Sequence, residues 1–156
     1  MDTGNAKMTR RNYILRWAAV VPGALLSVFV AMFPIHWVVM LQYMDTPDYD
    51  ASDLEALLSP QTFESLANAF FTPLIFIAVG SRIAPKFKFS TGIALAVLLV
   101  VLYGWAATVV VGEIQQGLYT PARWLRLGIT MLLCIAGLAV GLLQARKVEQ
   151  GVLSTP

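Results

Sequence analysis

The sequence LRLGITMLLCIAGLAVGLL, residues 125–143, decides the fold class. Arg126 is its only charged residue, and Arg146 and Lys147 follow shortly after it. An α-helix of about 20 apolar residues is long enough to cross the hydrocarbon core of a bilayer. A helix on the surface of a soluble protein would instead carry a polar face. The stretch is therefore predicted to be a transmembrane helix.

The composition supports a membrane protein with little else in the chain. Of its 156 residues, 58% are hydrophobic and 13% are charged, whereas soluble domains carry roughly 25% charged residues. The single cysteine, Cys134, excludes an internal disulfide and any cysteine-rich metal or iron–sulfur site. It is interpreted as a small packing residue. We expect one domain, residues 1–156, that forms a four-transmembrane-helix bundle.

Three further apolar runs complete the predicted bundle. The four spans are predicted at residues 17–41, 62–84, 90–112 and 124–145. The first run is too long for the h-region of about 7–15 residues in a cleavable signal peptide, so it is expected to be retained. Pro34 should kink this helix or loosen its last turns. Ser59 and Pro60 fit the N-cap and first position of the second helix, and Pro85 should end it.

The distribution of basic residues predicts the orientation. Nine of the eleven Lys and Arg residues fall on one side of this layout, and only Arg123 and Arg126 fall on the other. The nine are Lys7, Arg10, Arg11, Arg16, Arg82, Lys86, Lys88, Arg146 and Lys147. Positive charge concentrates on the cytoplasmic side of membrane proteins. We therefore expect a plasma (inner) membrane protein with both termini in the cytoplasm.

Small residues recur every fourth position in all four spans. In a bilayer such positions let helix backbones approach closely. The groups are Gly23, Ser27 and Ala31; Gly80 and Ala84; Gly104, Thr108 and Gly112; and Gly137, Gly141 and Ala145. Four such faces exceed what a small bundle needs for its own packing. Besides membrane lipids, the expected partners are therefore other membrane subunits or further copies of this chain.

The predicted outer loop, residues 42–61, is strongly acidic. It carries Asp45, Asp48, Asp50, Asp53 and Glu55 and no basic residue. Ser52 and Glu55 fit a capping box that would open a short helix. The loop can be interpreted as a solvated segment, or as a docking site for a basic partner or for Arg123 and Arg126. A calcium site is disfavoured, because the glycine and terminal glutamate of an EF-hand loop are missing.

Charged residues also flank the second outer loop. Glu113 ends the third predicted span, and Arg123 and Arg126 begin the fourth. Charges near a membrane interface pair with one another or extend toward water. An ion pair between Glu113 and one of these arginines is expected. An anion or lipid-headgroup site at the same place is the alternative.

Few polar side chains lie within the spans. His36 is the only histidine and is placed near the outer interface, where it could pack, hydrogen-bond, relay protons or bind a ligand. Asn68 and Thr72 lie one turn apart, just before Pro73. They could form interhelical hydrogen bonds or line a polar path for a solute. A metal site is not predicted, since a lone histidine cannot form one.

The motifs of catalysis are missing from the sequence. It has no phosphate-binding glycine loop, no Ser–His–Asp set and no acids paired for catalysis. We expect no enzyme activity, no cofactor and no nucleic-acid partner. The leading hypothesis is a non-catalytic subunit or scaffold of a larger membrane assembly. A self-assembled channel or carrier for ions or small solutes is the alternative, and a sensor with an acidic outer loop is a third.

Overall fold

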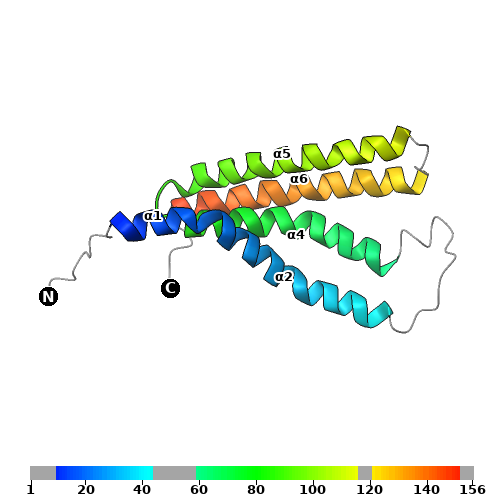
Figure 1. Ribbon diagram of the computed structural model, residues 1–156, viewed down its shortest axis with the longest axis horizontal. Helices are drawn as coiled ribbons and strands as arrows, with labels where there is room; N and C mark the ends of the chain where they lie inside the picture. Colours follow the sequence, from blue (N-terminus) through cyan, green and yellow to red (C-terminus); the bar gives the residue numbers. More distant parts are fainter. Residues whose placement is uncertain (1–9, 44–58, 116–120, 152–156) are drawn as a thin grey trace.

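The computed structural model describes residues 10–43, 59–115 and 121–151, and all of its regular elements there are helices. They are α1 (Arg10–Ala18), α2 (Val20–Tyr43), α4 (Pro60–Ile83), α5 (Lys88–Gln115) and α6 (Pro121–Glu149). The last four are long and apolar enough to span a membrane (Figure 1). The apolar segments are Val20–Leu41, Thr62–Ile83, Lys88–Gly112 and Arg123–Glu149. The prediction of four such helices is confirmed.

The start of the first span differs from the prediction. Residues 17 and 18, predicted as the start of the span, belong with the polar residues 10–16 to a separate helix, α1, and α2 begins only at Val20. Pro22 explains the interruption, because a proline ring clashes with the carbonyl four residues earlier, here that of Ala18. Hydrogen bonds still cross the junction, from the Ala19 amide to the Leu15 carbonyl at 3.0 Å. The result is a local bend at which α2 turns away from α1 (Figure 1).

α2 continues through Pro34 to Tyr43, so of the two predicted effects of this proline the loosened last turns are absent. Two other boundary predictions need correction. α5 includes residues 113–115, which were predicted to begin a loop, because Glu113 and Gln115 are good helix formers. α6 runs four residues beyond the predicted end and is followed by Gly151, which has a φ of 78°. Glycine adopts this left-handed conformation readily, so it commonly follows the end of a helix.

Helix α4 lies at the centre of the bundle and contacts α2, α5 and α6 (Figure 1). Ser59 is its N-cap, as predicted: the Ser59 hydroxyl accepts a hydrogen bond from the Thr62 amide at 3.3 Å. Pro60 occupies the first helical position, where its missing N–H costs nothing. The helix ends at Ile83, with Ala84 as C-cap and Pro85 immediately after it.

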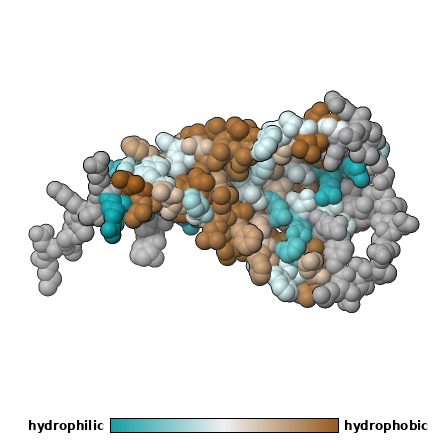
Figure 2. All heavy atoms as spheres, viewed as in Figure 1, coloured by the Kyte–Doolittle hydropathy of each residue, from teal (hydrophilic) through white to brown (hydrophobic). Residues whose placement is uncertain are grey.

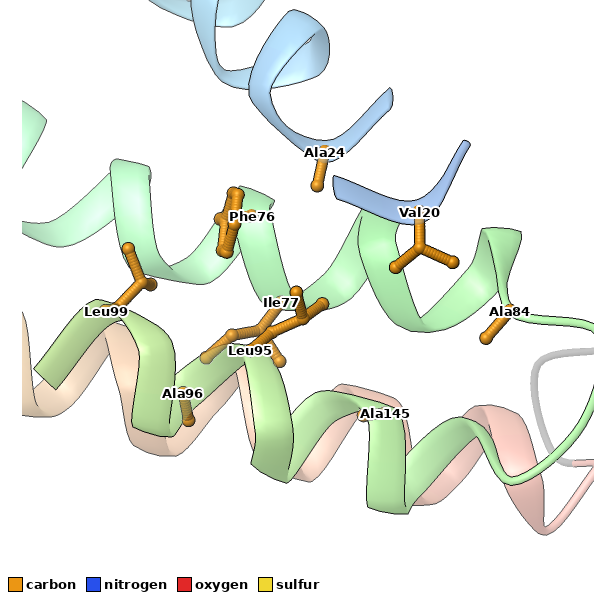
Figure 3. Packing of buried hydrophobic residues seen from close by; sticks show 9 residues of the cluster. All are labelled: Val20, Ala24, Phe76, Ile77, Ala84, Leu95, Ala96, Leu99 and Ala145. Carbon is orange, nitrogen blue, oxygen red and sulfur yellow. The ribbon is translucent and has the colours of Figure 1, made fainter. Parts of the chain in front are cut away.

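The buried core lies toward one end of the bundle. We call this the basic end; α4 ends and α5 begins here, and it carries Arg82, Lys86, Arg146 and Lys147. The core cluster consists of Val20, Ala24, Phe76, Ile77, Ala84, Leu95, Ala96, Leu99 and Ala145 (Figure 3). All of these belong to the parts of their helices nearest the basic end. The described helices therefore pack most tightly there.

Toward the other end, which we call the loop end, α2 diverges from α4 (Figure 1). Here α2 ends, α4 begins, and α5 and α6 meet their connecting loop. Large apolar side chains are exposed in this half, including Trp105, which is 75% exposed. Figure 2 shows hydrophobic surface across the middle of the molecule, with hydrophilic residues toward both ends. Lipid tails would cover such a surface at little cost.

Candidate functional site

A polar contact joins α2 to α4 toward the loop end. His36 Nδ1 lies 3.0 Å from Glu64 Oε1, a hydrogen bond that becomes an ion pair when the imidazole is protonated. The His36 side chain is 53% exposed and that of Glu64 is 23% exposed. Partly exposed pairs stabilise a fold by at most about 1 kcal/mol. The contact therefore matters more for where it places a carboxylate than for stability.

Glu64 was not among the candidate residues from the sequence. It lies close to the start of α4 and was grouped there with the polar beginning of the span. A spacing signal was available, because Glu64, Asn68 and Thr72 are four residues apart and so share one helix face. We call these three residues, with His36 from α2, the polar stripe. An acid or histidine within a span usually has a partner, which would have pointed from His36 to Glu64.

Asn68 is the unusual member of the polar stripe. Its Oδ1 atom is buried and has no hydrogen-bond donor among the described residues. Thr72, one turn further along, is half-buried. Pro73 has no N–H, so it offers no hydrogen bond to the carbonyl of Ala69. This part of α4 therefore carries more acceptors than its own helix can satisfy.

The polar stripe stops at the apolar core. Phe76 is 2% exposed and Ile77 is fully buried, and both lie about one turn after Thr72 on α4. Ser81 is the next buried hydroxyl of α4, and it donates to the carbonyl of Ala78 on its own helix at 3.1 Å. Along the described part of α4, the stripe extends inward from the loop end but does not reach the basic end.

Most of the predicted small-residue positions lie at contacts inside the fold. A Cβ atom at Gly137 would meet the carbonyl oxygen of Phe70, with Pro73 Cγ at 2.8 Å. One at Gly141 would lie 3.1 Å from Ile77 Cβ. Gly137 and Gly141 therefore set the close approach of α6 to α4.

The basic end holds the remaining close approaches. Gly80 faces Leu95 and Ala24; Gly23 faces Ile83 Cδ1; Ala145 lies against Gly92; and Ala84 is fully buried. On α2, Ser27 donates to the carbonyl of Ala24 at 2.8 Å, and Ala31 is half-buried. The groups on α2, α4 and α6 thus lie at or beside helix contacts within the chain.

The group on α5 is different. Gly104 and Gly112 have no atom within 4 Å of the place where a Cβ would stand. Thr108 between them is exposed, and its hydroxyl donates only to the carbonyl of Trp105 on the same helix, at 2.6 Å. We call Gly104, Thr108 and Gly112 the open α5 face. No described helix of the chain packs against its glycines.

Cys134 lies in the middle of α6, where it is half-buried. Its thiol lies close to the hydroxyl of Tyr103 on α5. Among the described residues, no group of three or more His, Cys, Asp or Glu side chains is placed to hold a metal ion. Cys134 thus takes part in a contact between two helices.

The charged candidates at the loop end are only partly described. Arg123 is exposed and Arg126 is half-buried, and the carbonyl of Arg126 accepts a hydrogen bond from Thr130. The side chain of Glu113 lies outside the described residues, so its ion pair stays a prediction. The same holds for the acidic residues Asp45, Asp48, Asp50, Asp53 and Glu55 and for the capping box.

No protein-family model, no curated protein and no solved structure matches this chain. The polar stripe and the open α5 face are the two features of the described chain that bear on its function.

Proposed function

We propose that the protein is a non-catalytic integral membrane subunit that binds another transmembrane helix through the open α5 face. The partner helix belongs to a different subunit or to a second copy of the chain. In this proposal both termini lie in the cytoplasm and the membrane is the plasma (inner) membrane, as the concentration of Lys and Arg at the basic end favours.

One observation carries the proposal: no described residue packs against the glycines of the open α5 face. Gly137, Gly141, Gly80 and Gly23 each face another helix, whereas in the described part of the chain Gly104 and Gly112 face none. Association of helices in lipid depends on close packing at small residues. Trp105, exposed beside this face, adds a large side chain of the kind that dominates interface energies. These features favour a helix from outside the chain.

The test is the assembly state of the chain purified in a mild detergent. We expect it to co-purify with a partner or to form a defined oligomer, and Gly104→Leu to abolish this by filling the space between the helices. Gly128→Leu is the matched control, because Gly128 on α6 is equally open. A wild-type monomer that retains no partner, or a Gly104→Leu variant that assembles normally, would contradict the proposal.

A channel or carrier for small solutes is the second candidate, and the polar stripe is the observation that favours it. His36 on α2 contacts Glu64 on α4, and Asn68 and Thr72 follow Glu64 at four-residue spacing along α4. Against it, Phe76 and Ile77 close the stripe within one chain. Ion flux into liposomes, abolished by Glu64→Gln, would support a carrier. Liposomes that contain intact protein and show no ion flux would exclude a channel or carrier.

A further inference from the structure

Asn68 provides the starting point, because its buried Oδ1 atom has no donor among the described residues. A buried acceptor left without a hydrogen bond costs about 1–3 kcal/mol. The atom is not accessible to a large partner, so the missing donor or cation must be small. A helix of another subunit, packed on the outside of the bundle, could not reach it.

Glu64 gives this place its charge. It lies one turn from Asn68 on the same face of α4, and His36 on α2 is the partner of its carboxylate. Besides Glu64 and His36, the described side chains of α2 and α4 include one ionisable group, Arg82, which is 18 residues further along α4 and about 27 Å away. On α6, which also packs against α4, Arg126 is half-buried and Arg123 exposed at the same end of the bundle. When His36 is neutral, the charge on the side of the site formed by α2 and α4 is the Glu64 carboxylate.

The remaining polar groups point to the same type of ligand. Glu64, Asn68 and the Ala69 carbonyl released by Pro73 are all oxygen acceptors. An excess of oxygen acceptors beside a carboxylate favours a cation and disfavours an anion. Glu64 and Asn68 lie in the first half of α4, which begins at the loop end.

We propose that Glu64 and Asn68 bind a small monovalent cation, either an alkali-metal ion or ammonium, and that His36 holds the carboxylate when the cation is absent. The site lies on α4 and does not depend on the open α5 face. His36 and the cation compete for one carboxylate, so removing the imidazole strengthens cation binding.

The experiment measures the unfolding temperature of the purified protein in NaCl, KCl, NH4Cl and choline chloride at equal ionic strength. We expect a saturable increase with a small cation and none with choline, which is too bulky for a buried site. Comparing the unfolding temperatures in NaCl and KCl with that in NH4Cl shows whether the bound cation is an alkali-metal ion or ammonium. Equal unfolding temperatures in all four salts would overturn the proposal.

Four variants locate the effect. Glu64→Gln should weaken cation binding about tenfold or more, since it removes a charged ligand. His36→Ala should strengthen binding by about two- to fivefold, because it removes the competitor. Asn68→Leu should abolish the salt effect yet unfold no earlier than wild type in choline chloride, because an unpaired acceptor has gone. Thr108→Val, on the open α5 face, is the control and should keep the full effect.

The set of variants still tests the proposal if one of them fails to fold. If Glu64→Gln fails to fold, Asn68→Leu and His36→Ala still give opposite changes in affinity. A salt effect that survives in Asn68→Leu, or one that weakens in His36→Ala, would overturn the proposal.

Discussion

Gly137 sets how closely α6 approaches α4. Its backbone lies against the carbonyl of Phe70 and the ring of Pro73. Backbone atoms cannot move aside as the end of a flexible side chain can, so the contact tolerates no Cβ. Pro73 is itself fully buried, which leaves little room for adjustment. The packing of the two helices therefore depends on this one position.

Gly137→Ala is expected to reduce the free energy of unfolding by about 1–3 kcal/mol, because an overpacked contact forces the helices apart. Gly128→Ala is the control, since a Cβ at Gly128 meets nothing within 4 Å. Denaturation in mixed micelles, followed by tryptophan fluorescence, measures both. If Gly137→Ala and Gly128→Ala are equally stable, the close approach of α6 to α4 at Gly137 is wrong.

Phe87 carries the only positive φ angle of a non-glycine residue in the described chain, 53°. It directly precedes α5, and its carbonyl accepts hydrogen bonds from the amide and the hydroxyl of Thr91. A left-handed conformation costs an ordinary residue roughly 1–2 kcal/mol. Its aromatic ring is 66% exposed, so the fold gains little burial in return.

Phe87→Asn should therefore raise the free energy of unfolding by about 1 kcal/mol, because asparagine tolerates the left-handed region. Phe89→Asn is the comparison, since Phe89 packs against the core and should lose stability. The same unfolding assay applies. A destabilised Phe87→Asn would indicate that the exposed ring makes contacts outside the chain.

For individual residues, the sequence predicted which positions matter for packing better than it predicted which residues they contact. The four-residue spacing identified Gly104 and Gly137 equally well, yet one is open and the other tightly packed. A spacing pattern marks a helix face but does not say which helix lies opposite, since that depends on tertiary packing. Glu64 was missed for a related reason. Its role depends on His36, 28 residues away on another helix.

Among the elements, the junction between α1 and α2 has a clear local cause. Pro22 lies three residues after Ala19, where the helix is interrupted. Pro34 has no comparable effect, because α2 continues through it. In transmembrane helices, neighbouring groups and small adjustments of the backbone often accommodate a proline.

Pro22→Ala is predicted to join α1 and α2 into one straight helix. In a Cys134→Ser background, spin labels at Asn12→Cys and Val30→Cys should then move apart to about 27 Å, the length of 18 helical residues. Pro34→Ala should leave that distance unchanged. An unchanged distance in Pro22→Ala would show that tertiary contacts, and not the proline, cause the bend.

The elements themselves were largely predictable, and the reason is physical. Apolar length identifies a membrane-spanning helix with few competing interpretations. The ends of α5 and α6 were predicted too early, because residues 113–115 and 146–149 include charged or polar side chains that are good helix formers. Hydropathy marks where a helix could leave the bilayer, and not where its hydrogen bonds stop.

For the whole molecule, the arrangement depends on α4. It contacts α2, α5 and α6, and the core cluster gathers at the basic end (Figure 3). α1 and the last turn of α6 lie at that same end, as four consecutive crossings require (Figure 1). Hydropathy gives one indication of the central helix, because the apolar segment of α4 is the least hydrophobic of the four. It does not say which helices pack against α4.

The proposed orientation predicts which positions share a side of the membrane. In a Cys134→Ser background, Arg11→Cys and Lys86→Cys should react with a membrane-impermeant maleimide only from the cytoplasmic side. Ser59→Cys should react only from the other side, because it lies at the loop end. Labelling of Lys86→Cys and Arg11→Cys from opposite sides would refute the four-span topology.

The central place of α4 has a consequence for biosynthesis. A chain enters the membrane from its N-terminus, so α2 is inserted before the helix against which it packs. Until residue 83 has left the ribosome, α2 has lipid or the insertion machinery as its neighbour. Nascent chains arrested before that point should therefore be open to degradation, whereas chains arrested after it already hold their first helix pair.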